Sequence, residues 1–492
     1  MFPRKQKYFT RLPFTLLLEI LFSVSLAAVN FYRILNIPIT IDENGYEPEY
    51  TYISLLRSTL GYANNHILHS VIRKWFIETF SDNVFFYRVD SLIAQILFLF
   101  FSLLICRHLF KNKWWQLCAF ITLNTISPLV FDFWGLSRGY ALSLSLMTIS
   151  IFYLLKYIEE RRIFLLSFSF AAAFLSVFSN FGYINYFIAL TGVVIIQQLI
   201  FKKTNDKNHL QKELAVLLIS IIALTLLIEE PLRNVYQRGE LAFLGTTGFI
   251  NDTISSLVRE GLFLPESLFS RSVIWFVTVF PVIGGCFWLF VYYRNNVRGR
   301  ETPKEERYGI ALFLLLIIPA ISILLQHALL GVNFLVARTA LFFIILFILN
   351  FIYLIYYIRS RVPKIAFGLL LVTTLLTGYN FVSKLNLNRT ILWWFDSDDL
   401  NVLTRIANEW ENKNEKIKVK AYWLFTASFR YDINHFYKNR FYPVEALSGP
   451  PDNDTTFDYY YIPLSDVSLM DTAKFRQDTA FVISGFILYR KK

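Results

Sequence analysis

The sequence contains very little cysteine, which limits the kinds of fold that it can form. Its three cysteines, Cys106, Cys118 and Cys286, all fall in or beside apolar stretches of the 492-residue chain. A disulfide framework needs more cysteines, and a structural metal site needs cysteine or histidine ligands at short, regular spacing. We therefore exclude a disulfide-stabilised fold and predict no metal site and no cofactor, while the sequence leaves a role for a divalent cation open.

Charged residues are also scarce, and they are unevenly placed. They make up 17% of the chain, against about a quarter in soluble domains, whereas 55% is hydrophobic and the mean hydropathy is +0.45. The net charge of +12 comes from basic clusters on alternate connections between apolar stretches, the pattern that orients membrane proteins. We therefore expect contact with a lipid bilayer and no nucleic-acid partner. The clusters are Arg4 to Arg11, Arg107 to Lys113, Arg161-Arg162, Lys202-Lys203, Arg294 to Arg307 and Arg359 to Lys364.

Two signals typical of soluble enzymes are missing as well. Neither a glycine-rich phosphate loop nor a nucleophile elbow stands out, which argues against a nucleotide-binding domain and hence against a nucleotide-sugar donor. The first apolar stretch, residues 14–35, is too long for the core of a signal peptide, and no small-residue cleavage site follows it. We interpret this stretch as a retained membrane span.

The sequence is rich in apolar stretches of about twenty residues, the length that crosses the hydrocarbon core of a bilayer. About eleven such stretches occur, so we predict an all-α, multi-pass protein of the cytoplasmic membrane. With the basic N-terminus in the cytoplasm, an odd number of spans places the C-terminus outside. The expected spans are residues 14–36, 89–107, 114–131, 139–157, 163–179, 183–201, 213–229, 272–293, 308–328, 339–358 and 364–382.

The chain divides where its composition changes. We expect residues 1–383 to form the transmembrane domain, which includes a long outer loop at residues 37–88. Residues 384–492 are more polar and should form a small α/β domain outside the membrane. Within this tail, residues 400–410 carry an apolar helical face, and three stretches alternate as strands do. The strand-like stretches are residues 416–425, 458–462 and 480–489.

The acidic pair Asp42-Glu43 is the first candidate for chemistry. It directly follows the first span, so it lies at the depth of lipid headgroups, where a polyprenyl phosphate would present its phosphate. A partly desolvated carboxylate at this depth can accept a proton from a hydroxyl or an amine. The structural alternative is a solvated loop pair or a helix cap near Thr40. At the end of the same loop, Arg88 and Asp90 are close enough in sequence to pair with each other.

His66 is the second candidate in this loop. It follows Asn64-Asn65 and precedes a stretch with one apolar helical face, typical of a helix that lies on a membrane surface. One interpretation is a capping or hydrogen-bonding residue. The other is a phosphate contact or a positioning group near Asp42.

Two arginines on the outer side complete the set of candidates. In the short outer turn of residues 132–140, Arg138 offers a fork for a phosphate, and Trp134 and Tyr140 offer faces for a sugar ring. The alternative is that Arg138 only snorkels to the membrane surface. Arg338 begins a span on the outer side, against the orientation rule, so its charge needs another reason to be there.

These motifs resemble those of glycosyltransferases of the GT-C fold. The likeness is greatest to the branch that contains the protein O-mannosyltransferases and the bacterial aminoarabinose transferases that modify lipid A. Those proteins carry an acidic pair in the first outer loop and, further along the loop, a histidine followed by two prolines. Asp42-Glu43 and the segment GYANNH at residues 61–66 match this arrangement, with Ile67-Leu68 in place of the prolines. The turn at residues 137–140 also resembles an outer turn of the bacterial members.

The resemblance implies an inverting transferase that moves a hexose or pentose from a polyprenyl-phosphate donor to a glycan, lipid or protein acceptor on the outer face. It implies that Asp42 is the general base and that Glu43 orients the acceptor or shares this work. Arg138 and Arg338 would neutralise the leaving phosphate, with support from His66. The residues expected to bind substrate are Asn65, His66, Trp134, Arg138, Tyr140 and Arg338.

Two other classes of protein remain open. A transporter or flippase for lipid-linked sugars would also bury arginines and carboxylates, although transporters often show internal repeats and charges near the middle of the membrane. A membrane scaffold with an outer interaction domain would give no reason for the candidate carboxylate, histidine and arginines to converge. Their positions in the folded chain therefore discriminate between the classes.

Overall fold

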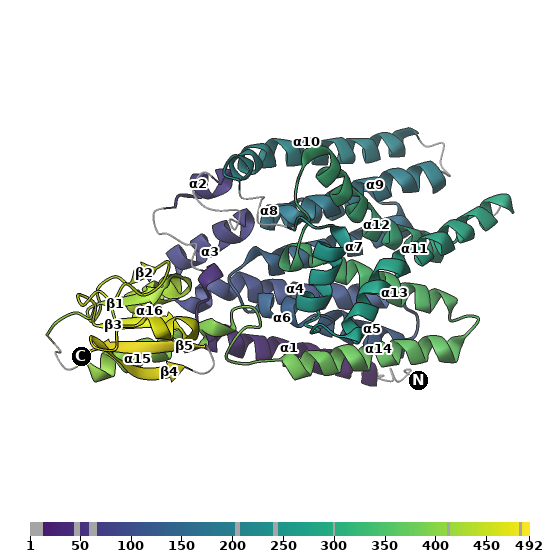
Figure 1. Cartoon of the computed structure of the whole chain (residues 1–492). Coiled ribbons are helices and arrows are strands. Elements are labelled where there is room, and N and C mark those ends of the chain that lie inside the picture. Colours follow the sequence, from purple (N-terminus) through teal and green to yellow (C-terminus); the bar gives the residue numbers. More distant parts are fainter. Residues whose placement is uncertain are drawn as a thin grey trace, which may run out of the picture.

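The computed structural model describes residues 13–43, 50–58, 66–201, 207–239, 245–298, 301–410, 414–481 and 485–492. Long helices lie side by side in a bundle, and a small domain with a β-sheet lies at one end of it and holds the C-terminus (Figure 1). This confirms the predicted class, a mostly helical multi-pass protein with a small C-terminal α/β domain. We call the end of the bundle next to this domain the site end, and the opposite end the basic end.

The membrane spans lie where the sequence predicts them. Among the described helices, eight are long and apolar enough to cross a bilayer, and the bent pair α5 (Lys113–Thr125) and α6 (Pro128–Trp134) could form a ninth span. Helices α8 (Ile163–Ser179) and α13 (Phe342–Ile358) are apolar but only 17 residues long. The eight long helices are α1 (Phe14–Asn36), α4 (Val84–Leu109), α7 (Gly139–Glu160), α9 (Ile184–Phe201), α10 (Lys207–Gln237), α11 (Leu268–Val297), α12 (Lys304–Leu330) and α14 (Pro363–Lys384).

The third expected span is not one straight helix, because α5 and α6 meet at an angle of 75°. Proline disfavours the helical conformation in the residue before it, and Ser127, which precedes Pro128, is extended with φ −133°. The Ser127 hydroxyl then accepts a hydrogen bond from the N–H of Val130 at 3.1 Å and caps α6. The prediction of a single helix over residues 114–131 is therefore wrong in shape, and α6 instead leads into the turn that carries Arg138.

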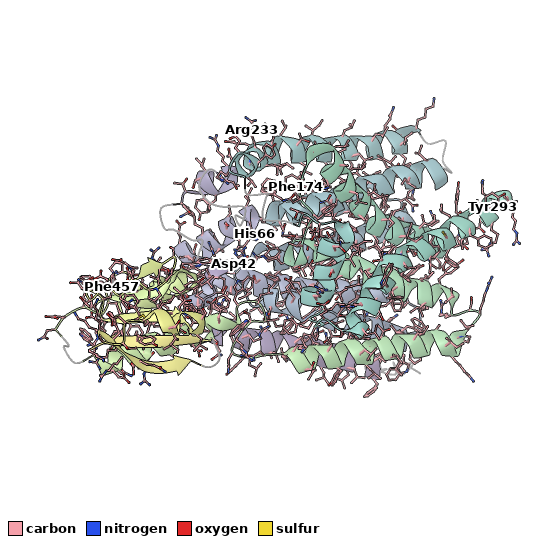
Figure 2. The ribbon with its side chains drawn as sticks, viewed as in Figure 1. Asp42, His66, Phe174, Arg233, Tyr293 and Phe457 are labelled. Atoms are coloured by element: carbon pink, nitrogen blue, oxygen red, sulfur yellow. The ribbon has the colours of Figure 1, made fainter. Side chains whose placement is uncertain are left out.

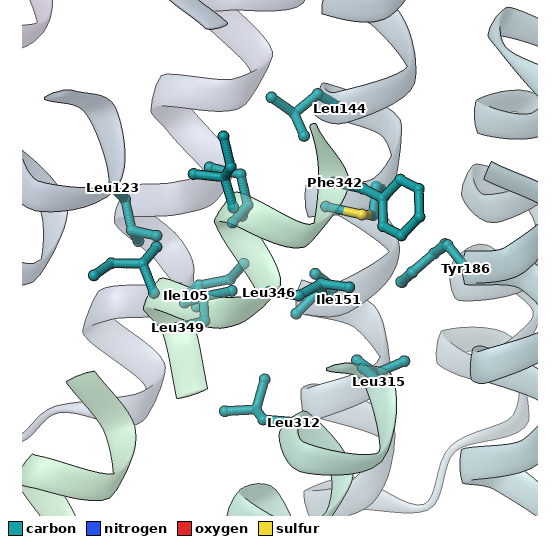
Figure 3. Packing of buried hydrophobic residues seen from close by; sticks show 14 of the residues in the cluster. Ile105, Leu123, Leu144, Ile151, Tyr186, Leu312, Leu315, Phe342, Leu346 and Leu349 are labelled. Carbon is teal, nitrogen blue, oxygen red and sulfur yellow. The ribbon is translucent and has the colours of Figure 1, made fainter. Parts of the chain in front are cut away.

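The core of the bundle forms around α7. In the most apolar 18-residue stretch of α7, 78% of the residues are buried inside the protein. In the corresponding stretch of α11 only 17% of the residues are buried, so α11 faces lipid over most of its surface. Figure 3 shows Ile151 of α7 near Phe342 and Leu346 of α13, with Leu315 of α12 on the same side. All four side chains are fully buried. A helix that is apolar all round, like α13, needs such neighbours on every side.

The basic clusters of the sequence gather at the basic end. Lys111, after α4, lies 3.6 Å from Glu305 at the start of α12, and Lys304 lies 2.7 Å from Glu159 near the end of α7. These helix ends therefore lie together, as the alternating charge pattern requires. The compartment that each end faces stays a prediction.

Short elements cover the site end. They include the turn η1 (Ile41–Glu43), helices α2 (Tyr52–Arg57) and α3 (Ile67–Thr79), the π-helical segments η4 (Phe249–Ile254) and η5 (Leu257–Gly261), and the turn η6 (Ala337–Ala340). Helix α3 is the expected amphipathic helix after His66. Its buried side carries His69, Arg73 and Lys74, whereas the Trp75 ring is half exposed. Ile67 is also fully buried, and Leu68 and Ile72 pack against the core of the bundle. Helix α3 therefore packs against the protein with polar and apolar residues alike.

The C-terminal domain is a mixed sheet with two helices. The expected helix is α15 (Asp399–Glu409), and α16 (Thr426–Phe436) follows the first strand. The sheet has the order β2-β1-β3-β5-β4, in which β1 is parallel to β2 and β3 and the other pairs are antiparallel. The strands are β1 (Val419–Tyr422), β2 (Glu445–Leu447), β3 (Tyr459–Pro463), β4 (Phe475–Phe481) and β5 (Phe486–Lys491).

Two strand predictions in this domain need correction. The strand expected over residues 416–425 ends at Tyr422, because Trp423 begins a short 3-10 turn that leads into α16. The strand expected over residues 480–489 is two strands of a hairpin. Gly485, with φ +73°, takes the left-handed conformation that glycine adopts without strain, and β5 begins directly after it.

Candidate active site

Asp42 lies at the site end between two arginines. Its side chain is 16% exposed, and its Oδ2 accepts a hydrogen bond from Nη1 of Arg338 at 2.6 Å. Nη2 of Arg138 lies 3.7 Å from the same oxygen, and Nη1 of Arg138 donates to the backbone carbonyl of Asp42. Figure 2 places Asp42 where the helices meet the C-terminal domain, with His66 nearby. Three segments that are far apart in sequence, η1, the start of α7 and η6, thus bring one carboxylate and two cations together.

Glu43, the other half of the acidic pair, is buried and held on all sides. Arg88 donates to its carboxylate through Nε at 2.7 Å and Nη2 at 2.6 Å, and the N–H groups of Ser137 and Thr40 donate at 2.6 and 2.9 Å. Burial alone would raise the pKa of this carboxyl, but the Arg88 charge and the N–H donors outweigh it and lower the pKa below 4.5. Glu43 is therefore a buried anion, and both of its carboxylate oxygens accept hydrogen bonds.

Arg88 also connects the end of the first span, α1, to Glu43. Its guanidinium is fully buried and also donates to the carbonyls of Ile34, Ile37 and Pro38 at 2.7–3.1 Å. These carbonyls follow the last turn of α1, where a helix leaves its acceptors unsatisfied. Arg88 therefore does not pair with Asp90 as expected, because Glu43 and the end of α1 take all its donors.

Asp90 belongs to a second buried network that sequence reasoning missed. Its carboxylate pairs with Nδ1 of His69, and Nε2 of His69 lies 3.2 Å from the Ser137 hydroxyl. Arg73 donates to the same hydroxyl at 3.3 Å and to the carbonyl of Glu43 at 3.0 Å. The network thus fixes Ser137, whose N–H holds Glu43. In the sequence, the only sign of this network was that His69 and Arg73 are polar residues at helical spacing in the helix predicted after His66.

His66 lies beside the start of α7 and is 6% exposed. Its Nδ1 donates to the carbonyl of Ser179 at 2.9 Å, and its Nε2 is buried without a partner among the described residues. Burial, with the charges of Arg138 and Arg338, lowers the pKa of His66 well below 6.5, so the ring is neutral at pH 7. Since Nδ1 carries the proton, Nε2 is a hydrogen-bond acceptor.

Gly139 makes this approach of His66 to α7 possible. A Cβ atom at position 139 would lie 2.2 Å from the Ser179 carbonyl oxygen and 2.5 Å from Cβ of His66. Next to it, the ring of Tyr140 packs edge-on against the His66 imidazole, with 4.7 Å between the ring centres. The guanidinium of Arg138 lies over the Tyr140 ring, 5.8 Å from its centre. Tyr140 therefore joins the histidine to the arginine.

One of the expected substrate contacts is placed differently. Trp134 is 3% exposed, packs against Phe98 at 5.1 Å and lies in the core, so its ring offers no face to a ligand. The expectation of a sugar platform at Trp134 came from its position in a short turn, but α6 rotates it inward. Asn65 lies outside the described residues.

The C-terminal domain touches the acidic loop. Oδ2 of Asp396 accepts a hydrogen bond from the N–H of Ile41 at 3.0 Å, directly before Asp42. Burial, together with the charges of Glu43 and Asp42, raises the pKa of Asp396 well above its usual 3.8, and burial raises that of Asp432 to about 7. Burial therefore makes both carboxyls weaker acids than an exposed aspartate.

A second tie joins the domain to the bundle. Asp132 pairs with Arg33 of α1, and its Oδ2 accepts from the N–H of Ile391 at 2.6 Å. Among the described residues no group of three or more histidines, cysteines and carboxylates could hold a metal ion.

An apolar cavity lies between the helices that follow the arginine-bearing turn η6 and their neighbours. It has a volume of about 680 Å³ and is lined by η4, η5, α11, α12, α13 and α14, with Phe249, Val258, Phe276 and Phe347 among its walls. Arg338 in η6 and Phe343 on the cavity wall are separated by less than two helical turns of chain. The cavity wall therefore begins at Phe343, five residues after Arg338, although Arg338 itself does not line the cavity.

The fold and the site define a polytopic helical membrane protein with one carboxylate held between two arginines at the end of its bundle. No family model and no curated protein matches the sequence. Among solved structures, the chain is similar to ArnT from Cupriavidus metallidurans bound to undecaprenyl phosphate, with 12% identity and a TM-score of 0.42 over 96% of this chain and 97% of that one. The apo structure of the same protein gives 10% identity and a TM-score of 0.44 over the same shares.

Proposed function

We propose that this protein is an integral membrane glycosyltransferase of the GT-C type. It moves a sugar from a polyprenyl-phosphate donor to an acceptor on the outer face of the membrane. The observation that carries the proposal is the placement of Asp42 between Arg138 and Arg338, together with an apolar cavity whose wall includes Phe343, five residues after Arg338. A phosphate on a lipid chain needs this combination of cations at the surface and apolar walls below it.

The two arginines take the charge that develops as the sugar leaves its phosphate. When the bond between the sugar carbon and the phosphate oxygen breaks, negative charge grows on the phosphate. Guanidinium groups stabilise it best when they are already in place, because no reorganisation is then needed at the moment of reaction. Tyr140 and Trp393 help to hold them, since Arg138 lies over the first ring at 5.8 Å and Arg338 over the second at 5.5 Å.

Asp42 acts as the base that removes the proton from the acceptor. Without a donor, its Oδ2 accepts a hydrogen bond from Arg338 at 2.6 Å and is occupied by that contact. A donor phosphate competes for Arg338 and releases Asp42 towards the acceptor. Asp42 is therefore freed when the donor is bound and takes the acceptor proton. The acceptor oxygen or nitrogen attacks the sugar carbon opposite the leaving phosphate, so that this carbon is inverted.

Glu43 and His66 support this chemistry by positioning the loop and by binding the sugar. Glu43 is a positioning residue, because its carboxylate is buried against Arg88 and Ser137 and holds η1 in place. His66 is neutral and its Nε2 is an acceptor, so it receives a hydrogen bond from a sugar hydroxyl rather than donating one to the phosphate. The polyprenyl chain lies in the apolar cavity.

The test is donor turnover by the purified full-length protein. It is incubated with a panel of polyprenyl-phosphate sugars and acceptors, and the loss of donor and the release of polyprenyl phosphate are measured. We expect Asp42→Asn to lower turnover by about 10²–10⁴, the usual cost of losing a positioned base, without loss of folding. Asp466→Asn is the matched control, since this carboxylate accepts a hydrogen bond from Ser465 in the C-terminal domain and is outside the proposed site.

Two outcomes would reject the proposal. Turnover by Asp42→Asn at the wild-type rate would remove Asp42 as the base. Movement of a lipid-linked sugar across liposomes with no loss of donor in the whole panel would favour the transporter instead.

A further inference from the structure

A second cavity lies at the basic end, far from the candidate active site. It has a volume of about 320 Å³ and is formed by the last turns of α11 and α13 and the connection to α14. Its walls are apolar at Phe287, Phe290 and Ile358 and polar at Arg294, Ser360 and Arg361. Figure 2 shows Tyr293, the neighbour of Arg294, at the opposite end of the molecule from Asp42. The cavity is therefore separate from the site of the proposed transfer.

The cavity carries more positive charge than its neighbours neutralise. Nη2 of Arg294 lies 3.4 Å from Glu306, but Glu306 also accepts from Tyr357 at 2.6 Å and from Asn295. Nε of Arg294 is buried without a partner among the described residues. Arg361 is exposed and has no carboxylate within 4.0 Å in the described part of the chain. Of the two guanidinium groups, only that of Arg294 thus contacts a carboxylate in the described part of the chain.

The position of the cavity selects the kind of anion. Arg294 and Arg361 stand where two spans end, at the depth of lipid headgroups, and Phe290 beside them is 61% exposed on the lipid-facing surface of α11. A soluble anion would use the arginines but leave the apolar wall uncovered. A phospholipid covers both, because its phosphate meets the arginines and its acyl chains lie along Phe287 and Phe290.

We propose that this cavity binds an anionic phospholipid of the leaflet at the basic end. A zwitterionic phospholipid fits less well, because its ammonium group would add a third cation beside the two arginines. The lipid fills the seam between α11 and α13, and this matters for α11, which buries only 17% of its apolar window in the protein. The inference is independent of the proposed transfer reaction.

The experiment measures thermal unfolding of the full-length protein in detergent while phosphatidylglycerol is added. Phosphatidylcholine with the same acyl chains and inorganic phosphate are added in parallel. We expect phosphatidylglycerol to raise the unfolding temperature to saturation, and the other two to raise it much less, since only a ligand of the folded state shifts the transition.

Two variants assign this shift to the cavity. Arg294→Gln with Arg361→Gln should weaken the apparent affinity for phosphatidylglycerol at least tenfold, and Arg361→Gln alone should weaken it without touching Glu306. The control is Arg162→Gln, another arginine of the basic end, which pairs with Glu160 at 3.4 Å and should bind as the wild type does.

Equal shifts with phosphatidylglycerol and phosphatidylcholine would overturn the proposal. So would wild-type affinity in the double variant, or an equal shift with inorganic phosphate, which would indicate a site for a free anion.

Discussion

Asp42 and Glu43 are neighbours in the chain, but their carboxylates lie in opposite settings. Glu43 is fully buried against Arg88, whereas Asp42 is 16% exposed and faces two arginines that a ligand phosphate would also seek. One residue thus stabilises the loop, and the other is left available for chemistry. At the scale of single residues, two predictions follow from this division of roles.

Removing the charge of Asp42 should strengthen the binding of polyprenyl phosphate. In the wild type Asp42 competes with the phosphate for Arg338, so Asp42→Asn leaves this arginine free for the ligand. We expect the affinity for polyprenyl phosphate to rise about 3- to 10-fold, or ~1 kcal/mol, while turnover falls. Equilibrium binding of the lipid to both proteins checks this, and weaker binding by the variant would contradict the competition.

Removing the charge of Glu43 should mainly cost stability. Glu43→Gln leaves Arg88 buried without an anion, which typically costs about 3–5 kcal/mol. The double variant Glu43→Gln with Arg88→Met should recover part of the loss, because no unpaired charge is then buried. Thermal unfolding in detergent measures both, and a double variant less stable than Glu43→Gln would show that Arg88 acts mainly through the carbonyls of α1.

From the sequence, the charged residues of the candidate site could be predicted better than the buried residues that hold them in place. Asp42, Arg138 and Arg338 stood out because each is a charge at the end of an apolar span, where it needs a reason. Arg88 and Asp90 are two residues apart, which suggested a pair, but their true partners, Glu43 and His69, are 45 and 21 residues away. Contacts over such separations depend on how helices pack, and no local pattern encodes them.

At the scale of elements, the start of α7 positions several groups at once. Arg138 precedes the helix, Gly139 lets His66 approach it, and Tyr140 packs against both His66 and Arg138. The helix itself was predictable from its apolar length, as were the other spans. The break before Pro128 and the hairpin at Gly485 were not, because both are single-residue backbone effects inside stretches with a continuous apolar pattern.

A methyl group at position 139 tests this arrangement. In Gly139→Ala the new Cβ would lie 2.2 Å from a backbone oxygen of Ser179, so α7 or α8 must shift. We expect a loss of about 1–3 kcal/mol in unfolding free energy, the usual cost of overpacking, together with reduced donor turnover. The control is Gly368→Ala in α14, where an added Cβ meets nothing within 4 Å, and an equal loss there would contradict the close-approach argument.

At the scale of the whole molecule, the C-terminal domain and the bundle share a polar contact. Asp396 holds the Ile41 N–H, Ile391 donates to Asp132, and Tyr431 of α16 packs against Tyr87 of α4 at 5.6 Å. The sequence predicted a separate outer domain from its composition. It gave no sign that this domain would contact the acidic loop, since the paired residues are hundreds of positions apart.

Buried carboxyls at this contact should make the folded state less stable as the pH rises. The pKa of Asp432 is raised from 3.8 to about 7, so the folded protein keeps a proton that the unfolded chain releases above pH 3.8. The stabilisation is complete below pH 3.8 and is lost as the pH rises through about 7, with a slope of at most about 1.4 kcal/mol per pH unit. Asp432→Asn should flatten the stability curve between pH 5 and 8.

The readout is the difference between the two unfolding curves across this range. His66 contributes with the opposite sign, because its lowered pKa adds stability as the pH rises through 6.5, but it contributes equally to both proteins. Parallel curves for the wild type and Asp432→Asn would contradict the assignment to Asp432.

The bond between Ile41 and Asp396 also sets an order of events during biosynthesis. The two residues are 355 positions apart, so the first turn after α1 cannot acquire its final partner until most of the chain has left the ribosome and been inserted. A product that stops before the tail could still place its spans. It would leave the Ile41 amide and one oxygen of Asp132 without partners, and its loop next to Asp42 would not be set. A chain truncated before Asp396 therefore lacks the hydrogen bond that holds the backbone next to Asp42.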